Sequence, residues 1–105
     1  MGQGLSLVAA IVFHRLARKE AQVAEAWYRT RNPEAADRFR LAVERTADRI
    51  AAAPDSYPFL RGPYRQLRVT GFPHVLIYRM RDDQSVMVVA VAHASRRPGY
   101  WRRRQ

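Results

Sequence analysis

The sequence RVTGFPHVLIYRM, residues 68–80, decides the fold of this chain of 105 residues. At its start the period is two, because Leu67 and Val69 fall on one side of an extended chain and their polar neighbours on the other. A glycine and a proline interrupt the pattern at residues 71–73, and residues 74–80 form the next strand. The stretch therefore predicts two neighbouring strands joined by a turn.

Further strands are predicted on both sides of this stretch. Residues 81–84, RDDQ, form a turn, and residues 85–92 contain four valines and hardly any polar group. Such a run is typical of a central strand that is covered on both faces. Residues 5–13 are apolar and rich in Val and Ile, which predicts a strand near the N-terminus.

Two helices are predicted between the first strand and the others. The first runs from about residue 16 to residue 31, because three alanines and Tyr28 recur at helical spacing, and we expect the adjacent Trp27 in the core with them. The second begins at Asn32, an N-cap residue followed by a proline at the first helical position and an acid in the first turn. It ends before Pro54. Its apolar stripe consists of Ala36, Phe39, Val43, Ala47 and Ile50.

These elements predict one α+β domain over residues 1–105 in the order β-α-α-β-β-β. Because almost no linker separates the helices, we expect an antiparallel helical hairpin packed on one face of a small, twisted, mainly antiparallel sheet. A loop is expected over residues 54–63, which hold three prolines and a glycine. We also expect a loose N-terminus over residues 1–4 and a basic tail over residues 96–105.

Positive charge is concentrated in the second half of the chain. The formal net charge is +10, and residues 61–105 hold ten arginines against two aspartates. Eighteen of the nineteen basic residues are arginine, whose planar guanidinium suits bidentate contacts with phosphate or carboxylate. We therefore expect a nucleic acid or an acidic protein as the partner.

Composition and motifs exclude several functional classes. Without cysteine the chain forms no disulfide and has no thiolate nucleophile. The apolar run near the N-terminus is too short to span a membrane and lacks the flanks of a signal peptide, so we expect a cytoplasmic protein with no membrane partner. No phosphate-loop, serine-nucleophile or zinc motif occurs, and no histidine pair has metal-ligand spacing, so we expect neither cofactor nor metal.

Four arginines of the predicted strands form the first candidate site. No acid lies between residues 61 and 81, so like charges crowd there in a way that a bound anion would relieve. A solvated face is the alternative for each arginine alone. For the set, we expect a shared anion site on the face or rim that the helices leave open. Its members are Arg65, Arg68, Arg79 and Arg81.

The stretch HASRRPGYWRRRQ, residues 93–105, is the second candidate site. His93 is either a structural histidine bonded to the backbone or a general acid or base. We expect Trp101 to anchor the tail, while Tyr100 either closes a hydrophobic edge or stacks on a base. If the protein is an enzyme, these groups and the arginines suit metal-free RNA cleavage, in which a base deprotonates the ribose 2′-OH.

Taken in order, the elements and motifs resemble the RelE/ParE superfamily of type II toxin–antitoxin toxins over about residues 12–104. The superfamily has the β-α-α-β-β-β fold expected above. The similarity rests on FHRLARKE at residues 13–20, AWY at 26–28, ADRF at 36–39, RVTGFPHVLIY at 68–78 and HASRRPGYW at 93–101.

The resemblance implies one of two activities. ParE-like toxins bind and inhibit DNA gyrase, whereas RelE-like toxins are ribosome-dependent mRNA endonucleases; either would link this chain to growth inhibition and plasmid stabilization. Both kinds are neutralised by an antitoxin, often acidic, that wraps the toxin. RelE-like enzymes commonly use strand lysines or a glutamate base, but this chain has only Lys19, in the first helix, and no glutamate after Glu44. We therefore expect a ParE-like toxin, with the RelE-like nuclease as the alternative and a basic binding module without toxicity as a third possibility.

The resemblance also suggests two sets of site residues. An RNase would use His93, Arg68, Arg79, Arg81 and Tyr100 for catalysis. The residues expected to bind antitoxin or target are Arg65, Arg68, Arg79, Arg81, Arg96, Arg97, Tyr100, Trp101 and Arg102.

Overall fold

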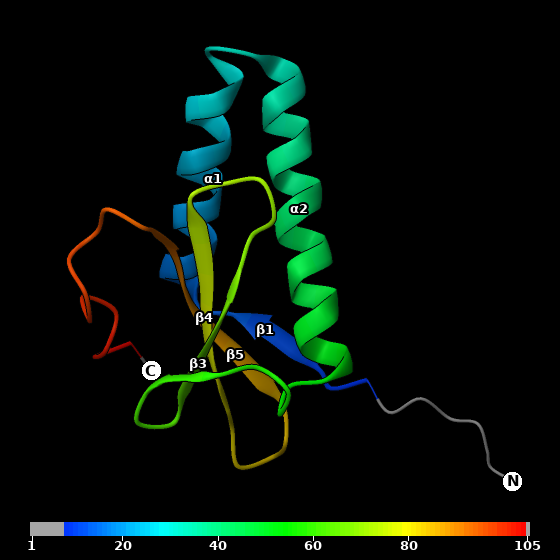
Figure 1. Cartoon of the computed structure of the whole chain (residues 1–105), viewed down its shortest axis with the longest axis vertical. Helices are drawn as coiled ribbons and strands as arrows, with labels where there is room; N and C mark the ends of the chain where they lie inside the picture. Colours follow the sequence, from blue (N-terminus) through cyan, green and yellow to red (C-terminus); the bar gives the residue numbers. More distant parts are fainter. Residues whose placement is uncertain (1–7, 105) are drawn as a thin grey trace, which may run out of the picture.

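A helical hairpin and a sheet form two layers in the computed structural model, which describes residues 8–104 (Figure 1). The sheet has five strands in the order β1-β5-β4-β3-β2, in which β1 runs parallel to β5 and all other neighbours are antiparallel. The α+β class and the mainly antiparallel sheet are therefore confirmed. The elements are β1 (Ile11–Phe13), α1 (Arg15–Arg29), α2 (Pro33–Ala52), β2 (Phe59–Arg61), β3 (Tyr64–Arg68), β4 (His74–Met80) and β5 (Val86–His93).

Local capping explains where both helices begin. The Asn32 side chain accepts hydrogen bonds from the N–H groups of Glu34 and Ala35, as its N-cap position predicts. His14 caps α1 in the same way, because its Nδ1 accepts the Leu16 N–H at 3.0 Å. The two helices pack side by side as the expected hairpin (Figure 1).

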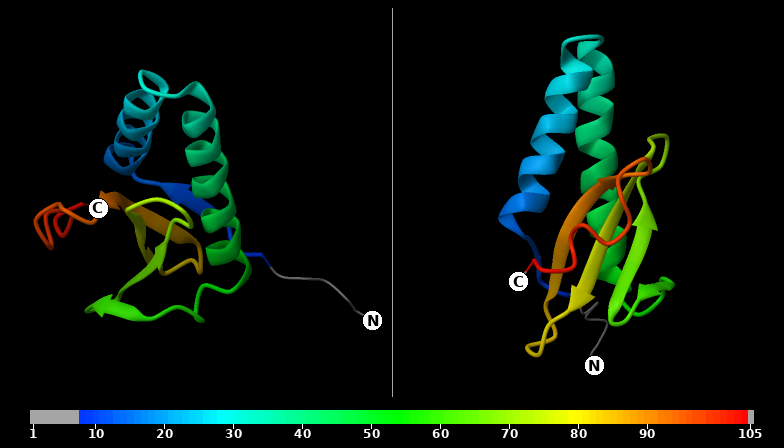
Figure 2. Two further views of the ribbon diagram at one scale, coloured as in Figure 1. Left: turned by 45° about the horizontal axis from the view of Figure 1, so that its top comes forward. Right: turned by 90° about the vertical axis from the view of Figure 1, so that its left-hand side faces the viewer.

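Two clusters of buried side chains cover the two faces of the sheet. The inner cluster lies under the helices and includes Phe39 and Ile50 of α2 and Tyr78 of β4. The outer cluster includes Ile77 of β4 and Trp101 of the tail, and Figure 2 shows the tail crossing the side of the sheet away from the helices. Strand β5 is buried along nearly its whole length, as its run of apolar residues predicts.

The structure corrects three expectations. A short edge strand, β2, lies within the expected loop over residues 54–63 and pairs with β3 around a turn in which Gly62 has φ +52°. Trp27 is 52 % exposed and does not belong to the core, although Tyr28 packs against Phe39. The first strand is confined to β1, since residues 8–10 are not in a strand. The expectations for residues 1–4 and 5–7 lie outside the described residues.

Candidate partner-binding site

A groove of about 700 Å³ runs between α1 and β5, and we call it the α1–β5 groove. Val23 and Trp27, one turn apart on α1, form its apolar wall and are 57 % and 52 % exposed, so together they make a small apolar patch. Charged side chains from α1 and from the start of the tail stand at its rim. Its other lining residues are Lys19, Glu20, Ala24, Tyr28, Pro73, His74, Val91, His93 and Arg96.

The edge of β5 beside this groove is closed by side chains instead of by a strand. Pairing with β1 reaches only Val88. Beyond it, the Val91 N–H donates to Glu20 Oε1 at 2.9 Å, and Arg104 Nη1 donates to the Val89 carbonyl at 2.9 Å. Two backbone groups that a partner strand would otherwise satisfy are thus bonded within the chain.

Glu20 ties the C-terminal tail to α1, and we call its contacts the Glu20 network. Arg104 makes a bidentate pair with the Glu20 carboxylate, with both N···O distances 3.0 Å and the two side chains 13 % and 15 % exposed. The Tyr100 hydroxyl donates to Glu20 Oε2 at 2.7 Å. Burial and this carboxylate raise the pKa of Tyr100 above its usual value, so the hydroxyl stays protonated.

Two histidines lie opposite each other at the end of the groove. His74 and His93 are register partners on β4 and β5, with ring centroids 5.1 Å apart. His74 is buried, and its Nδ1 has no hydrogen-bond partner within residues 8–104. Burial, with a smaller contribution from His93, lowers the pKa of His74 to about 4. The exposed His93 ring accepts a hydrogen bond from the Ser95 N–H at its Nδ1. This contact agrees with the alternative in which His93 is a structural histidine bonded to the backbone.

Trp101 anchors the tail, as expected. It is 3 % exposed and packs edge-on against Tyr64 of β3 with ring centroids 4.6 Å apart. Around it, the Arg96 guanidinium lies 3.8 Å from the centre of the Tyr100 ring. A second hollow of about 700 Å³, which we call the basic hollow, has no acid in its lining. It is lined by Arg97, Gly99, Tyr100, Arg102 and Arg103.

Gly99 allows the tail to turn in this hollow. Its φ of +78° is a conformation that other residues rarely adopt. A Cβ there would lie 2.9 Å from Arg102 Nε and 3.3 Å from Arg61 Nη1. The turn therefore brings two guanidiniums close together at the edge of the basic hollow, where an anion would relieve their repulsion.

The structure does not bring together the four arginines of the first candidate site, two on β3, one on β4 and one directly after β4. Arg65 faces the helix side, since it is paired with Tyr78, and its Nη1 donates to the carbonyls of Asp55 and Tyr57 at 3.2 and 2.7 Å. Arg81 donates from Nε to the Ser85 hydroxyl at the β4–β5 turn. Residues an odd number apart on a strand point to opposite faces, which separates Arg65 from its neighbour in the set.

The other two arginines share the outer face but not one site. Arg68 is paired with Val75, and Arg79 with Met87, and both partners belong to the outer cluster. Val75 and Arg79 are four positions apart on β4, which is about 13 Å along a strand. They therefore contribute to a basic face and do not converge on one anion.

The expected catalytic set is also dispersed. His93 lies on the helix-facing side of the sheet with His74, opposite to Arg68 and Arg79. Arg81 follows the far end of β4, about 20 Å along the strand from the His93 pair. The Tyr100 hydroxyl is engaged by Glu20.

Several residues of the α1–β5 groove were not predicted as site residues from the sequence. Val23 and Trp27 lie four residues apart, one turn after Lys19, and this apolar pair beside Tyr28 was the available signal. Glu20 gave no local signal, because its partners lie 71 to 84 residues further along the chain. His74 also lines the groove.

Comparison with known proteins identifies the family. Within residues 8–104, no helix is long and apolar enough to cross a bilayer, and no three metal-ligating side chains come together. No curated protein matches this chain. The family model described as the ParE toxin of the type II toxin–antitoxin system, parDE, matches residues 11–98, which span every helix and strand of the fold. The chain therefore belongs to the ParE toxin family, within the RelE/ParE superfamily, and is a type II toxin whose family implies a cognate antitoxin.

Proposed function

We propose that this protein arrests growth in the cytoplasm by binding and inhibiting DNA gyrase, and that an antitoxin docked in the α1–β5 groove neutralises it. Together with its antitoxin it would then stabilise a plasmid that carries both. We prefer gyrase to mRNA as the target because the residues expected to form an RNase site are dispersed over the fold. Metal-free cleavage needs a base, an acid and cations around one phosphate, but His93 and the strand arginines lie on opposite faces.

The chemistry of the α1–β5 groove supports an antitoxin segment as its occupant. Val23 and Trp27 offer apolar area, and Trp27 is the kind of residue that often contributes most to binding. Lys19 and Arg96 at the rim suit carboxylates. An acidic segment with a few large apolar side chains would bury Val23 and Trp27 and neutralise Lys19 and Arg96.

The basic hollow supports the tail as the surface that meets the target. Its arginines have no acid beside them in the lining, and Trp101 holds the tail in place from below. We assign Arg97 and Arg102 to target binding, together with the outer-face arginines, Arg68 and Arg79. Arg65 and Arg81 are bonded within the fold, so they contribute less.

Two parallel assays test the target. Purified protein should inhibit gyrase-dependent supercoiling of relaxed plasmid and leave mRNA intact on programmed ribosomes. An Arg97→Ala, Arg102→Ala double variant should weaken inhibition, while His93→Ala should leave it unchanged. Cleaved mRNA with unaffected gyrase would establish the RelE-like alternative. Inactivity in both assays, with normal colony formation on expression, would favour a basic binding module.

The antitoxin site is tested by binding. Trp27→Ala should weaken antitoxin affinity by at least about tenfold, as expected for a central aromatic anchor. Leu60→Ala is the matched control, because that side chain is also exposed but lies on β2, outside the groove. Equal affinities for Trp27→Ala and the unmodified protein would place the antitoxin elsewhere.

A further inference from the structure

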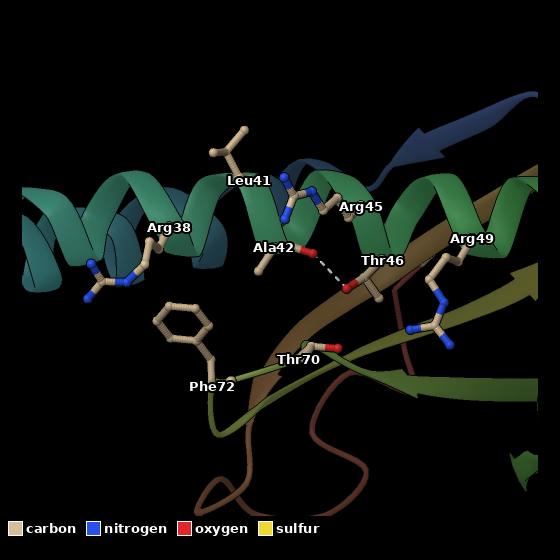
Figure 3. Close-up of a pocket in the computed structure, with 9 residues that line it drawn as sticks. Arg38, Leu41, Ala42, Arg45, Thr46, Arg49, Thr70 and Phe72 are labelled. Carbon is tan, nitrogen blue, oxygen red and sulfur yellow. Dashed lines mark hydrogen bonds between the residues drawn. The ribbon is translucent and has the colours of Figure 1, made fainter.

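A third groove, separate from the two sites above, lies between α2 and the turn that joins β3 to β4. It has a volume of about 520 Å³, and we call it the α2 arginine groove. Figure 3 shows Arg38, Arg45 and Arg49 projecting from α2, with Phe72 below the helix. The turn contributes Thr70, Gly71 and Phe72 to its wall.

The three arginines form a row without an internal counter-ion. At 100° per residue they fall within about 40° on the helical wheel. No acid lines the groove, and within residues 8–104 none of their guanidiniums makes an ion pair or a hydrogen bond. By contrast, Arg29 and Arg40 on the same hairpin are paired with carboxylates.

Three of the four acids of α2, Asp37, Glu44 and Asp48, lie on another face of the helix, whereas Glu34 precedes Arg38 by one turn and, among the described residues, makes no ion pair with it. Glu44 and Asp48 line a hollow between α1 and α2 together with Glu25. The helix therefore places three of its four acids toward α1 and its three unpaired arginines toward the β3–β4 turn. Three positive charges held within about 16 Å along the helix axis repel one another unless an anionic partner is present.

The groove also has apolar walls. Leu41 is 39 % exposed, and Phe72 is half-buried beside Ala42. The Thr46 hydroxyl donates to the Ala42 carbonyl at 2.7 Å, which satisfies the only hydrogen that this side chain could offer a ligand (Figure 3). A ligand that matches this groove would therefore bring both anionic and apolar groups.

We infer that the α2 arginine groove binds an acidic amphipathic segment of a protein partner. Its apolar side chains would pack on Leu41 and Phe72, and its carboxylates would pair with the three guanidiniums. A nucleic acid backbone matches the charge but leaves the apolar wall uncovered, so the protein segment is the better fit. The inference is independent of gyrase inhibition and of the α1–β5 groove.

Peptide binding to the full chain, produced by cell-free synthesis, tests this inference. The probe is a fluorescein-labelled synthetic peptide with leucine and glutamate at helical spacing, followed by fluorescence anisotropy. All variants are made in a Trp27→Ala background, because the α1–β5 groove is proposed to bind a segment of the same kind. Arg45→Glu should weaken its binding by about tenfold, since an attractive charge becomes repulsive. Arg40→Glu is the matched control, with the same charge change on another face of α2, and should change the dissociation constant by less than about twofold. Leu41→Ser should weaken binding without altering charge.

Several outcomes would overturn the inference. These are equal losses for Arg45→Glu and Arg40→Glu, no effect of Leu41→Ser, or no binding of the peptide at concentrations up to about 1 mM. Tighter binding of a single-stranded oligonucleotide of equal charge, with the same loss in Arg45→Glu, would assign the groove to nucleic acid instead. Unchanged melting temperatures of all variants confirm that each is folded.

Discussion

The buried His74 makes the stability of this protein depend on pH, and replacing it with phenylalanine should remove that dependence. Its Nδ1 has no hydrogen-bond partner within the described residues, so His74→Phe breaks no bond at that atom. The His74 ring packs edge-on against Phe39, with centroids 4.9 Å apart, and lies close to Tyr28. A phenyl ring can keep these contacts and has no proton to bind.

The magnitude follows from the two pKa values. His74 has a pKa of about 4 in the folded chain against 6.5 for an ordinary histidine. Between these values the unfolded chain binds a proton that the folded chain does not. The contribution of neutral His74 is therefore complete above pH 6.5 and is lost as the pH falls toward 4. The loss reaches about 2 kcal/mol at pH 5 and about 3 kcal/mol at pH 4.

Urea unfolding at pH 7, 6 and 5, followed by circular dichroism, measures this loss. Between pH 7 and pH 5 the unmodified protein should lose about 2 kcal/mol more than His74→Phe, because the carboxylates that also titrate are common to both. His93→Gln is the control and should keep most of the pH-dependent loss, since burial is the larger cause of the lowered His74 pKa. Equal losses in the unmodified protein and His74→Phe would refute the reasoning.

Four further substitutions test the tail and the groove. Trp101→Ala should destabilise the fold by about 3–5 kcal/mol in guanidinium unfolding, because the side chain fills the outer cluster, and a loss below about 1 kcal/mol would contradict the anchoring. Glu20→Ala should cost about 3–5 kcal/mol, since it leaves the Arg104 guanidinium half-buried and unpaired. Adding Arg104→Met should recover part of that loss in a double-mutant cycle, and strictly additive losses would deny the coupling. Trp27→Ala should change the free energy of unfolding by less than about 1 kcal/mol, because this side chain is exposed. A larger loss would indicate that Trp27 belongs to the core.

Local patterns predicted most of the fold correctly because they depend on neighbouring residues. The Asn32 cap and the apolar stripe of α2 act within a few residues of each other, and they placed the second helix correctly. Strand β2 was not predicted, because it is a three-residue edge strand between prolines. Its pairing with β3 outweighs the low strand propensity of this stretch. The exposure of Trp27 was not predicted for a related reason. Helical spacing shows which residues share a side of α1, but not how far the sheet reaches beneath it.

The sequence by itself determined the class, the hairpin, the basic second half and the motifs typical of the family, because each arises from composition or short-range order. Only the tertiary structure decided which charged groups meet. Glu20 bonds to Tyr100 and Arg104, which follow it by 80 and 84 residues in the sequence. Strand register places Arg65 and Arg68 on opposite faces of the sheet. Strand register and the path of the tail depend on the packing of the whole chain, so no local pattern contains them.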